Sequence, residues 1–205
     1  SVVGTGGHGV ERAFPEEKEY KQWKLDLIHG LVDAPLITRP TDGKKNVIRA
    51  VQKEAKAADS LVIATDFDRE GELIGLESLE VALEVNPELE PTVKRARYSA
   101  LTKEEIEGAF SNLDTLSYPL AHAAGARQDI DLIWGAAFPR AVSLMAKAYG
   151  ANFLSVGRVQ SPTLGLIVER ELERRAHVFV PYWELFAKFE HPSGSSFETH
   201  HATDK

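Results

Sequence analysis

The chain has 205 residues, of which 43% are hydrophobic and 27% charged, a balance typical of one medium-sized or two small globular domains and not of disordered or fibrous proteins. It contains no cysteine, which excludes disulfide scaffolds, zinc ribbons and thiol chemistry within these residues. The formal net charge is −7, and the acidic excess lies mainly in residues 1–93, which hold 11 basic and 18 acidic side chains. Residues 94–175 hold 11 basic and 9 acidic side chains, so the centre of the chain can still attract a polyanion.

Membrane insertion and secretion are not predicted. The longest apolar runs, such as residues 61–64, are far shorter than the roughly 18 residues that a membrane span needs. The first residues contain neither a basic flank nor the apolar core of a signal peptide, so no secretory signal is visible. We therefore expect a soluble, cytoplasmic protein.

The first hundred residues alternate between strand and helix patterns. Val2 and Val3 run into a glycine cluster, which predicts a strand entering a loop. Residues 45–58 carry apolar side chains at helical spacing and predict a helix. The continuous apolar run 60–65 predicts a strand buried in a parallel sheet.

A helix is predicted to resume at Leu73, and a further strand is predicted within residues 92–98. This alternation indicates an α/β unit whose functional loop lies at the carboxyl end of a strand. Thr102 and Glu105 form a capping box that opens another helix, and the pattern stays helical to Arg175.

From Val178 the sequence turns β-like until it reaches Pro192. We expect three domains, at residues 1–102, 103–178 and 179–205. The last of these is expected to be the start of a larger β-rich domain that the chain cuts short.

An acidic string follows the predicted buried strand. Asp66, Asp68 and Glu70 alternate, so an extended backbone would point their three carboxylates to one side. Hard oxygen ligands at one open site suit Mg²⁺, and Arg69 would face elsewhere or reach a phosphate. The alternative is a solvated acidic turn in which Asp66 caps the next helix.

A second polar block lies at residues 154–164. Ser161 followed by Pro162 predicts an N-cap and first turn, so a helix begins there. Its free N–H groups, with Arg158 and Gln160 beside them, make a site for a phosphate and a base edge. The alternative is that Arg158 pairs with a neighbouring carboxylate while Gln160 is an ordinary surface residue.

Two further candidates lie outside these blocks. Arg127 and Asp131 are four residues apart on a predicted helix, so they share a face and form either an ion pair or part of a nucleic-acid groove. His8 lies between two glycines, where it is either a loop residue or a ligand-binding one.

The acidic string closely resembles a known motif. The acidic motif of the Toprim domain of type IA DNA topoisomerases is matched by Ala64-Thr65-Asp66-Phe67-Asp68-Arg69-Glu70-Gly71-Glu72. Residues 154–164 resemble the DNA-strand-binding segment of the same enzymes. Residues 126–135 resemble the family's Ala-Arg helix, and Gly7-His8 resembles its glycine-histidine loop. Residues 133–140 are closest to archaeal-type members.

The resemblance implies an α/β Toprim fold, a Rossmann-like parallel sheet with flanking helices, followed by a mostly helical domain and the start of a β segment. It implies Mg²⁺ as cofactor, single-stranded DNA as partner, no small-molecule cofactor, and a monomeric, nucleoid-associated parent enzyme. The catalytic residues would be Asp66, Asp68, Arg69 and Glu70, with Asp66, Asp68 and Glu70 holding the metal. The DNA contacts would come from His8, Arg127, Asp131, Ser155, Gly157, Arg158, Val159, Gln160 and Ser161.

The sequence also departs from the family. Type IA enzymes cut one strand through a tyrosine, leave a 5′-phosphotyrosine, pass a strand and reseal without ATP. None of the five tyrosines lies in the family's Tyr-x-Arg-Thr context; they are Tyr20, Tyr98, Tyr118, Tyr149 and Tyr182. The opening Toprim strand with its glutamate is also missing. We therefore expect a piece of such an enzyme that is inactive by itself.

Two alternatives remain open. A Toprim nuclease or primase would not need the block at residues 157–160. A non-catalytic single-strand-binding module would stack bases on more aromatic side chains than residues 120–175 carry.

Overall fold

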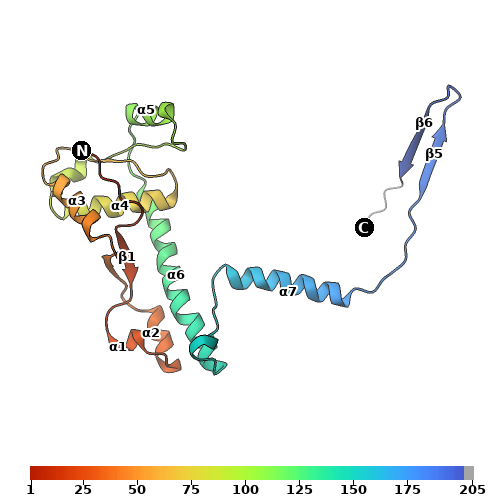
Figure 1. Ribbon diagram of the computed structural model, residues 1–205, viewed down its shortest axis with the longest axis horizontal. Coiled ribbons are helices and arrows are strands. Elements are labelled where there is room, and N and C mark those ends of the chain that lie inside the picture. Colours follow the sequence, from red (N-terminus) through yellow and green to blue (C-terminus); the bar gives the residue numbers. More distant parts are fainter. Residues whose placement is uncertain (201–205) are drawn as a thin grey trace. The chain divides into compact units, whose positions relative to one another are not determined.

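The computed structural model describes residues 1–200, which fall into two compact units divided after Ser161. Among the described residues, no helix is both long and apolar enough to cross a membrane. Figure 1 labels the elements along the chain.

The first unit contains the predicted parallel pair of strands. β3 (Val62–Ile63) and β4 (Lys94–Arg95) run parallel, with Ile63 opposite Arg95, and Arg95 also bridges to Asp114. A parallel pair needs a crossover, which α4 (Arg69–Leu83) and the 3₁₀ helix η2 (Pro87–Thr92) supply. The parallel arrangement is confirmed, with strands shorter than the sequence predicted.

Helices cover this pair. α3 (Lys45–Ala55) confirms the helix predicted at residues 45–58. Two clusters of buried apolar side chains hold α3, α4, η2 and the strands together; the first contains Ala55, Ala82 and Leu89, and the second contains Ile63, Leu79 and Leu116.

α4 begins four residues earlier than predicted. The Asp68 carboxylate accepts a hydrogen bond from the Gly71 backbone N–H at 2.7 Å and caps the helix, so the helix starts at Arg69 rather than at Leu73. The alternative in which Asp66 is the cap is wrong for the same reason.

The strand predicted at Val2 and Val3 is wrong. Residues 1–9 form no strand, and Val2 is exposed. Gly6 and Gly7 have φ of +59° and +106°, which breaks any extended run, and the Lys44 ammonium donates to the carbonyl of Gly6 at 2.8 Å. The glycine cluster is therefore an ordered loop tied to the N-terminal end of α3.

The first strand is β1 (Val10–Ala13), which pairs antiparallel with β2 (Ile37–Pro40). The connection between them contains three short helical segments: α1 (Lys18–Lys21), η1 (Leu25–Leu27) and α2 (Ile28–Val32).

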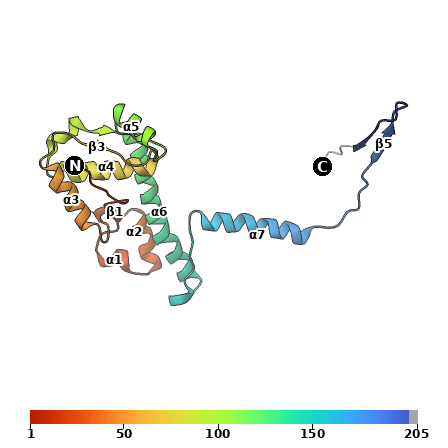
Figure 2. The same cartoon turned by 45° about the horizontal axis from the view of Figure 1, so that its top comes forward.

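The helical second half of this unit agrees with the prediction. Thr102 caps α5 (Lys103–Ser111) by accepting the Glu105 N–H at 3.3 Å, which confirms Thr102 as the N-cap of the predicted helix. α6 (Tyr118–Met145) follows as a helix of 28 residues, and η3 (Gly150–Asn152) comes after it. Figures 1 and 2 show α6 passing across the end of α4, against which it packs.

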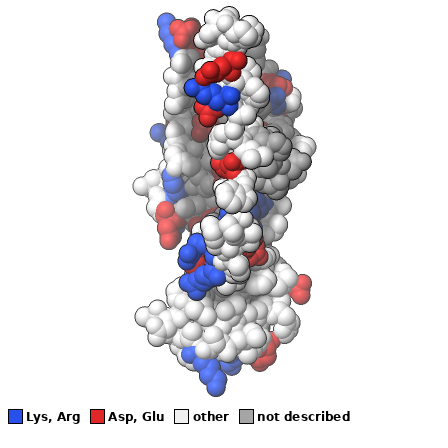
Figure 3. Space-filling model, turned by 90° about the vertical axis from the view of Figure 1, so that its right-hand side faces the viewer, with Lys and Arg blue, Asp and Glu red and all other residues white. Residues whose placement is uncertain are grey.

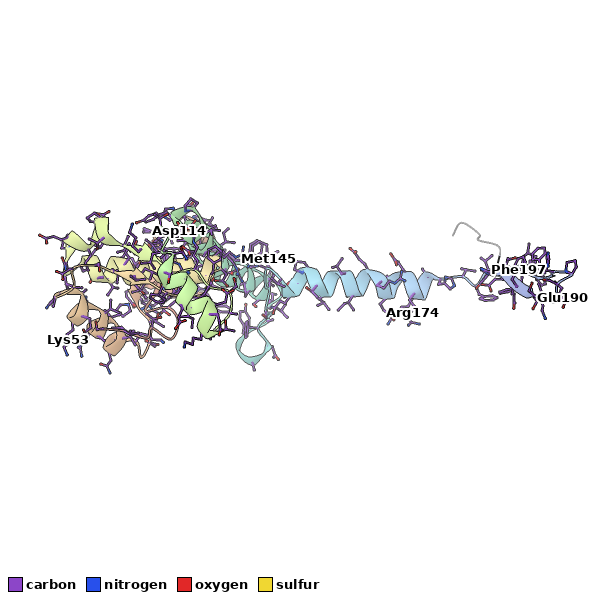
Figure 4. All side chains as sticks on the ribbon, turned by 90° about the horizontal axis from the view of Figure 1, so that it is seen from above. Lys53, Asp114, Met145, Arg174, Glu190 and Phe197 are labelled. Carbon is purple, nitrogen blue, oxygen red and sulfur yellow. The ribbon has the colours of Figure 1, made fainter. Side chains whose placement is uncertain are left out.

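The second unit holds most of α7 (Gln160–Ala176) and a hairpin of β5 (Phe186–Glu190) and β6 (Ser196–His200). The β segment begins at Phe186, because residues 178–185 pair with no strand of the described chain. Arg174 projects from α7 in Figure 4, and Phe197 stacks on Phe189 in the hairpin at 5.2 Å between ring centres. The fold is an α/β unit followed by helices and a β segment, as the sequence predicts.

Candidate functional site

The acidic loop lies between β3 and α4, at the carboxyl end of a parallel strand. Asp66 and Asp68 line one open hollow of about 260 Å³, whose other walls are Phe67, Tyr98 and the segment 99–101. The guanidinium of Arg97 covers the Phe67 ring at 5.0 Å. Two carboxylates therefore share one solvent-accessible site.

Only two of the three carboxylates of the expected set line this hollow, and the full set of Asp66, Asp68 and Glu70 stays a prediction. Since α4 begins at Arg69, the extended run ends at Asp68, and Glu70 belongs to the first turn of the helix. Within residues 1–200 no group of three or more His, Cys, Asp or Glu side chains is placed to hold a metal ion. Asp66 and Asp68 remain as the pair that could bind one.

The loop is pressed onto α4 because glycine faces it. A Cβ on Gly71 would lie 2.0 Å from the Asp66 carbonyl oxygen, and a Cβ on Gly75 would lie 2.6 Å from Ile63 Cγ2. Thr65 reinforces the contact by donating its hydroxyl to the Gly71 carbonyl at 2.6 Å. The Gly71 of the acidic motif is thus explained by close backbone approach.

A buried ion pair lies behind the loop. Arg95 Nε donates to Glu72 Oε1 at 2.7 Å, and both side chains are fully buried. This ion pair was not predicted from the sequence. The available signal was Glu72 on the same helical stripe as Gly75 and Leu79, because a carboxylate on an apolar stripe needs a buried partner.

His8 brings the glycine loop to α4. Its Nε2 lies 2.8 Å from Glu70 Oε1 and its Nδ1 lies 2.9 Å from Glu77 Oε2. The amide nitrogen of Gln128, on α6, is 3.3 Å from His8 Nε2. Three segments far apart in the sequence therefore meet at this ring, so His8 is more than a loop residue.

The contacts of His8 change its titration. Burial disfavours the imidazolium, but the hydrogen bonds to Glu77 and Glu70 outweigh it and raise the pKa of His8 above 6.5. Burial also raises the pKa of Glu77, against the opposing effect of His8. Glu77 was not predicted, although it follows Glu70 by seven residues and so shares its helical face.

A second cluster lies on α6 and the segment that follows it. Arg158 Nη2 donates to Asp131 Oδ2 at 3.1 Å, and Arg127 Nε lies 3.6 Å from the same oxygen. The hydrogen bond from Arg158 lowers the pKa of Asp131. The two ion pairs that were the alternatives to nucleic-acid binding are therefore both present.

All three side chains of this cluster are exposed. Solvent-exposed ion pairs contribute little to stability, so folding does not explain why two guanidinium groups gather there. In Figure 3, Lys and Arg lie beside Asp and Glu rather than in a patch of one sign.

The segment after η3 is held by local hydrogen bonds. Gln160 Nε2 donates to Ser155 Oγ at 2.6 Å, and the buried Ser143 hydroxyl on α6 accepts the Leu154 N–H at 2.8 Å. A Cβ on Gly157 would lie 2.7 Å from Gln160 Cγ, so the Gln160 side chain folds over that glycine. Val159 is exposed beside it.

Ser161 is not the N-cap that the sequence predicted. α7 begins at Gln160, which places Ser161 within the first turn. Its hydroxyl accepts the Gly157 N–H at 3.2 Å and closes the preceding turn. The Ser161 backbone N–H also donates to the Gly157 carbonyl at 3.2 Å, so a helical turn is already closed at Ser161 and the helix starts one residue before the expected cap.

A larger hollow of about 520 Å³ lies elsewhere, between β1, α1, β2 and α6. None of the predicted site residues lines it. Arg12 pairs there with Asp129 at 2.8 Å and Arg39 with Glu11 at 2.7 Å, so much of its charge is neutralised internally.

Comparison with known proteins supplies the family. Residues 1–101 match the model of the Toprim domain, and residues 115–205 match the model described as DNA topoisomerase. DNA topoisomerase 1 of Archaeoglobus fulgidus is 49% identical over 190 residues, covering 92% of this chain and 28% of that protein. The chain belongs to the type IA DNA topoisomerase family.

Other relatives of this family agree. DNA topoisomerase 1 of Thermoplasma acidophilum is 41% identical over 92% of this chain and 24% of that protein. DNA topoisomerase 3-alpha of Arabidopsis thaliana is 34% identical over 87% of this chain and 20% of that protein. The chain thus spans about a quarter of the length of the relatives it matches.

The family match agrees with the acidic loop described above, because Toprim domains bind divalent metal ions. The boundary between the two matched regions lies within residues 102–114, whereas the two compact units of the structure divide after Ser161. The three-domain division stays a prediction.

Proposed function

We propose that this chain forms the metal-binding and strand-binding part of an enzyme that cuts one DNA strand, passes another through the break and reseals it. The meeting of three segments at His8 is the observation that carries the proposal. The His8 ring joins the glycine loop, the acidic start of α4 and α6. The contact with α6 is made by Gln128, which is the neighbour of Arg127 in the sequence. Acidic and basic candidates thus belong to one compact unit.

Asp66 and Asp68 fit a magnesium ion by their chemistry. They offer hard oxygen donors in one open hollow, and Mg²⁺ keeps several waters while binding through one or two carboxylates and a substrate phosphate. A bound ion would neutralise charge on the phosphoryl oxygens. In this arrangement the Glu70 carboxylate is hydrogen-bonded to His8 and would not bind the ion together with the two aspartates.

The basic side chains would hold the DNA strand. Arg69 occupies the first position of α4, where the helix dipole and its own charge both favour a phosphate. Arg127 and Arg158 would bind further phosphates, with Asp131 orienting both guanidinium groups. Gln160 would reach a base edge of a single strand, which duplex DNA does not expose in the same way.

We propose that Tyr98 is not the attacking tyrosine, although that residue lines the hollow. The Tyr98 hydroxyl donates to the Ala64 carbonyl at 2.6 Å and supports the end of β3. We propose that the nucleophile, the acid for the leaving 3′-oxygen and a monomeric assembly belong to the whole protein. The cytoplasmic, nucleoid-associated location stays a prediction.

Anisotropy of a fluorescent single-stranded oligonucleotide tests the strand-binding role. We expect binding that weakens steeply with salt, duplex DNA bound more weakly, and a salt slope reduced by about one unit in Arg158→Ala. Arg170→Ala is the control, because Arg170 is a solvent-exposed arginine on α7 outside the cluster. Unchanged affinity and slope in Arg158→Ala would assign Arg158 to a structural ion pair, and equal binding of duplex would refute the strand preference.

A further inference from the structure

Arg95 directs its guanidinium at the backbone behind the acidic loop. Besides the ion pair with Glu72, Nη2 donates to the Asp66 carbonyl at 2.8 Å, and Nη1 donates to the carbonyls of Ala96 at 2.5 Å and Ile63 at 3.3 Å. One side chain therefore binds the end of β3 and the first aspartate of the loop.

Glu72 extends the connection to α6. Its Oε1 accepts Arg95 Nε, and its Oε2 accepts the Ser117 backbone N–H at 2.8 Å. Ser117 immediately precedes α6, the helix that carries Arg127 and Asp131. The ion pair thus joins the acidic loop to the start of the helix with the basic candidates.

Stability alone does not account for such a pair. Burying two charges removes their hydration, and well-packed apolar side chains of similar volume often stabilise a fold as well or better. An apolar pair could not donate a hydrogen bond to the Asp66 carbonyl. The distinctive contribution of Arg95 is therefore geometric: it fixes the backbone from which the Asp66 carboxylate projects.

We propose that Arg95 is the positioning residue of the metal site, and that Glu72 holds Arg95 in place and ties the loop to α6. The proposal rests on the proposed function in one respect, namely that Asp66 binds a divalent cation. Outer groups that orient metal ligands change metal affinity by about 10- to 100-fold when they are removed.

The test compares Arg95→Lys with Leu89→Ala in the whole 205-residue chain. Lysine keeps the charge but has no planar fork to reach several acceptors at once. Leu89→Ala opens a cavity in the cluster of Ala55 and Ala82, so it lowers stability without removing a contact to the loop. Comparing these two variants separates an effect on the position of the loop from a general loss of stability.

Two readouts are required. Without metal, ¹⁵N relaxation is expected to give order parameters for residues 66–68 near about 0.85 in the parent chain and below about 0.6 in Arg95→Lys. With Mn²⁺ as probe, broadening of signals from residues 66–72 is expected to need at least about tenfold more metal in Arg95→Lys. Leu89→Ala is expected to leave both unchanged.

The proposal is overturned if the loop in Arg95→Lys stays as ordered as in the parent chain, or if Leu89→Ala shifts both readouts equally. If Asp66→Asn leaves the Mn²⁺ titration of the parent chain unchanged, the metal site of the proposed function fails, and the relaxation measurement decides the positioning role by itself.

Glu72→Gln is measured if Arg95→Lys does not fold. It keeps an oxygen for Arg95 but loses the second acceptor, which serves Ser117. The proposal requires faster hydrogen exchange at the Ser117 N–H and weaker Mn²⁺ binding in this variant. Unchanged values of both would overturn it.

Discussion

Replacing Gly71 by alanine tests the close contact between α4 and the acidic loop. The new Cβ would lie 2.0 Å from the Asp66 carbonyl oxygen and 2.9 Å from its carbonyl carbon. Ordinary contact begins at 3.4 Å, so the loop backbone has to retreat by about 1.4 Å, the difference between 3.4 and 2.0 Å. That retreat pulls the Asp66 carbonyl away from Arg95, which now donates to it at 2.8 Å.

The magnitude follows from three contributions. Overpacking costs about 1–3 kcal/mol. A lost hydrogen bond to a buried charged group costs about 1.5–3 kcal/mol. The better helix propensity of alanine offsets about 1 kcal/mol of this. We therefore expect the free energy of unfolding to fall by roughly 1.5–5 kcal/mol, measured by urea denaturation followed by circular dichroism.

Gly108→Ala is the matched control. Gly108 lies inside α5, and a Cβ there would meet no heavy atom within 4 Å. The same substitution is expected to raise the free energy of unfolding by about 0.5–1 kcal/mol, because alanine loses less backbone entropy on folding. If Gly71→Ala is as stable as the parent chain, or both variants change in the same direction, the steric reasoning is refuted.

Three further predictions concern the site. Asp66→Asn combined with Asp68→Asn should abolish the Mn²⁺-induced broadening of their neighbours, and an unchanged NMR titration would refute the metal pair. Since the pKa of His8 is raised above 6.5 in the folded state, the protonated ring should stabilise the fold fully below about pH 6.5, and this stabilisation should be lost as pH rises through the higher folded pKa. Melting temperatures across pH 5–9 should show this loss. A loss of the same size in His8→Gln would contradict the assignment to His8. Tyr98→Phe removes the hydrogen bond to Ala64 and should cost about 1 kcal/mol in urea unfolding. A covalent adduct of this chain with labelled single-stranded DNA that depends on Tyr98 would show that we have misassigned that residue.

Local patterns were enough for much of the architecture. The helix at residues 45–55, the N-cap at Thr102 and the two strand segments at residues 62–63 and 94–95 follow from periodicity, short apolar runs and hydrogen bonds between near neighbours. The ion pair of Arg127 with Asp131 also follows from helical spacing. These features need no information about distant residues.

The boundaries of the site were not predictable in the same way. An Asp-x-Asp string can stay extended or cap a helix, and here packing decides: the Asp66 backbone lies on Gly71, so Asp68 reaches the Gly71 N–H and α4 starts at once. Ser161 does not cap α7 for a different, local reason, since its hydroxyl accepts the N–H of Gly157, four residues earlier.

The sequence by itself thus determined the α/β architecture and the segments that carry the chemistry, because those depend on interactions over a few residues. Only the tertiary structure decided which side chains meet. His8 reaches Glu77 across 69 positions and Arg95 reaches Glu72 across 23. No spacing rule links residues so far apart, because their contact depends on how strands and helices pack and on where burial leaves a charge in need of a partner.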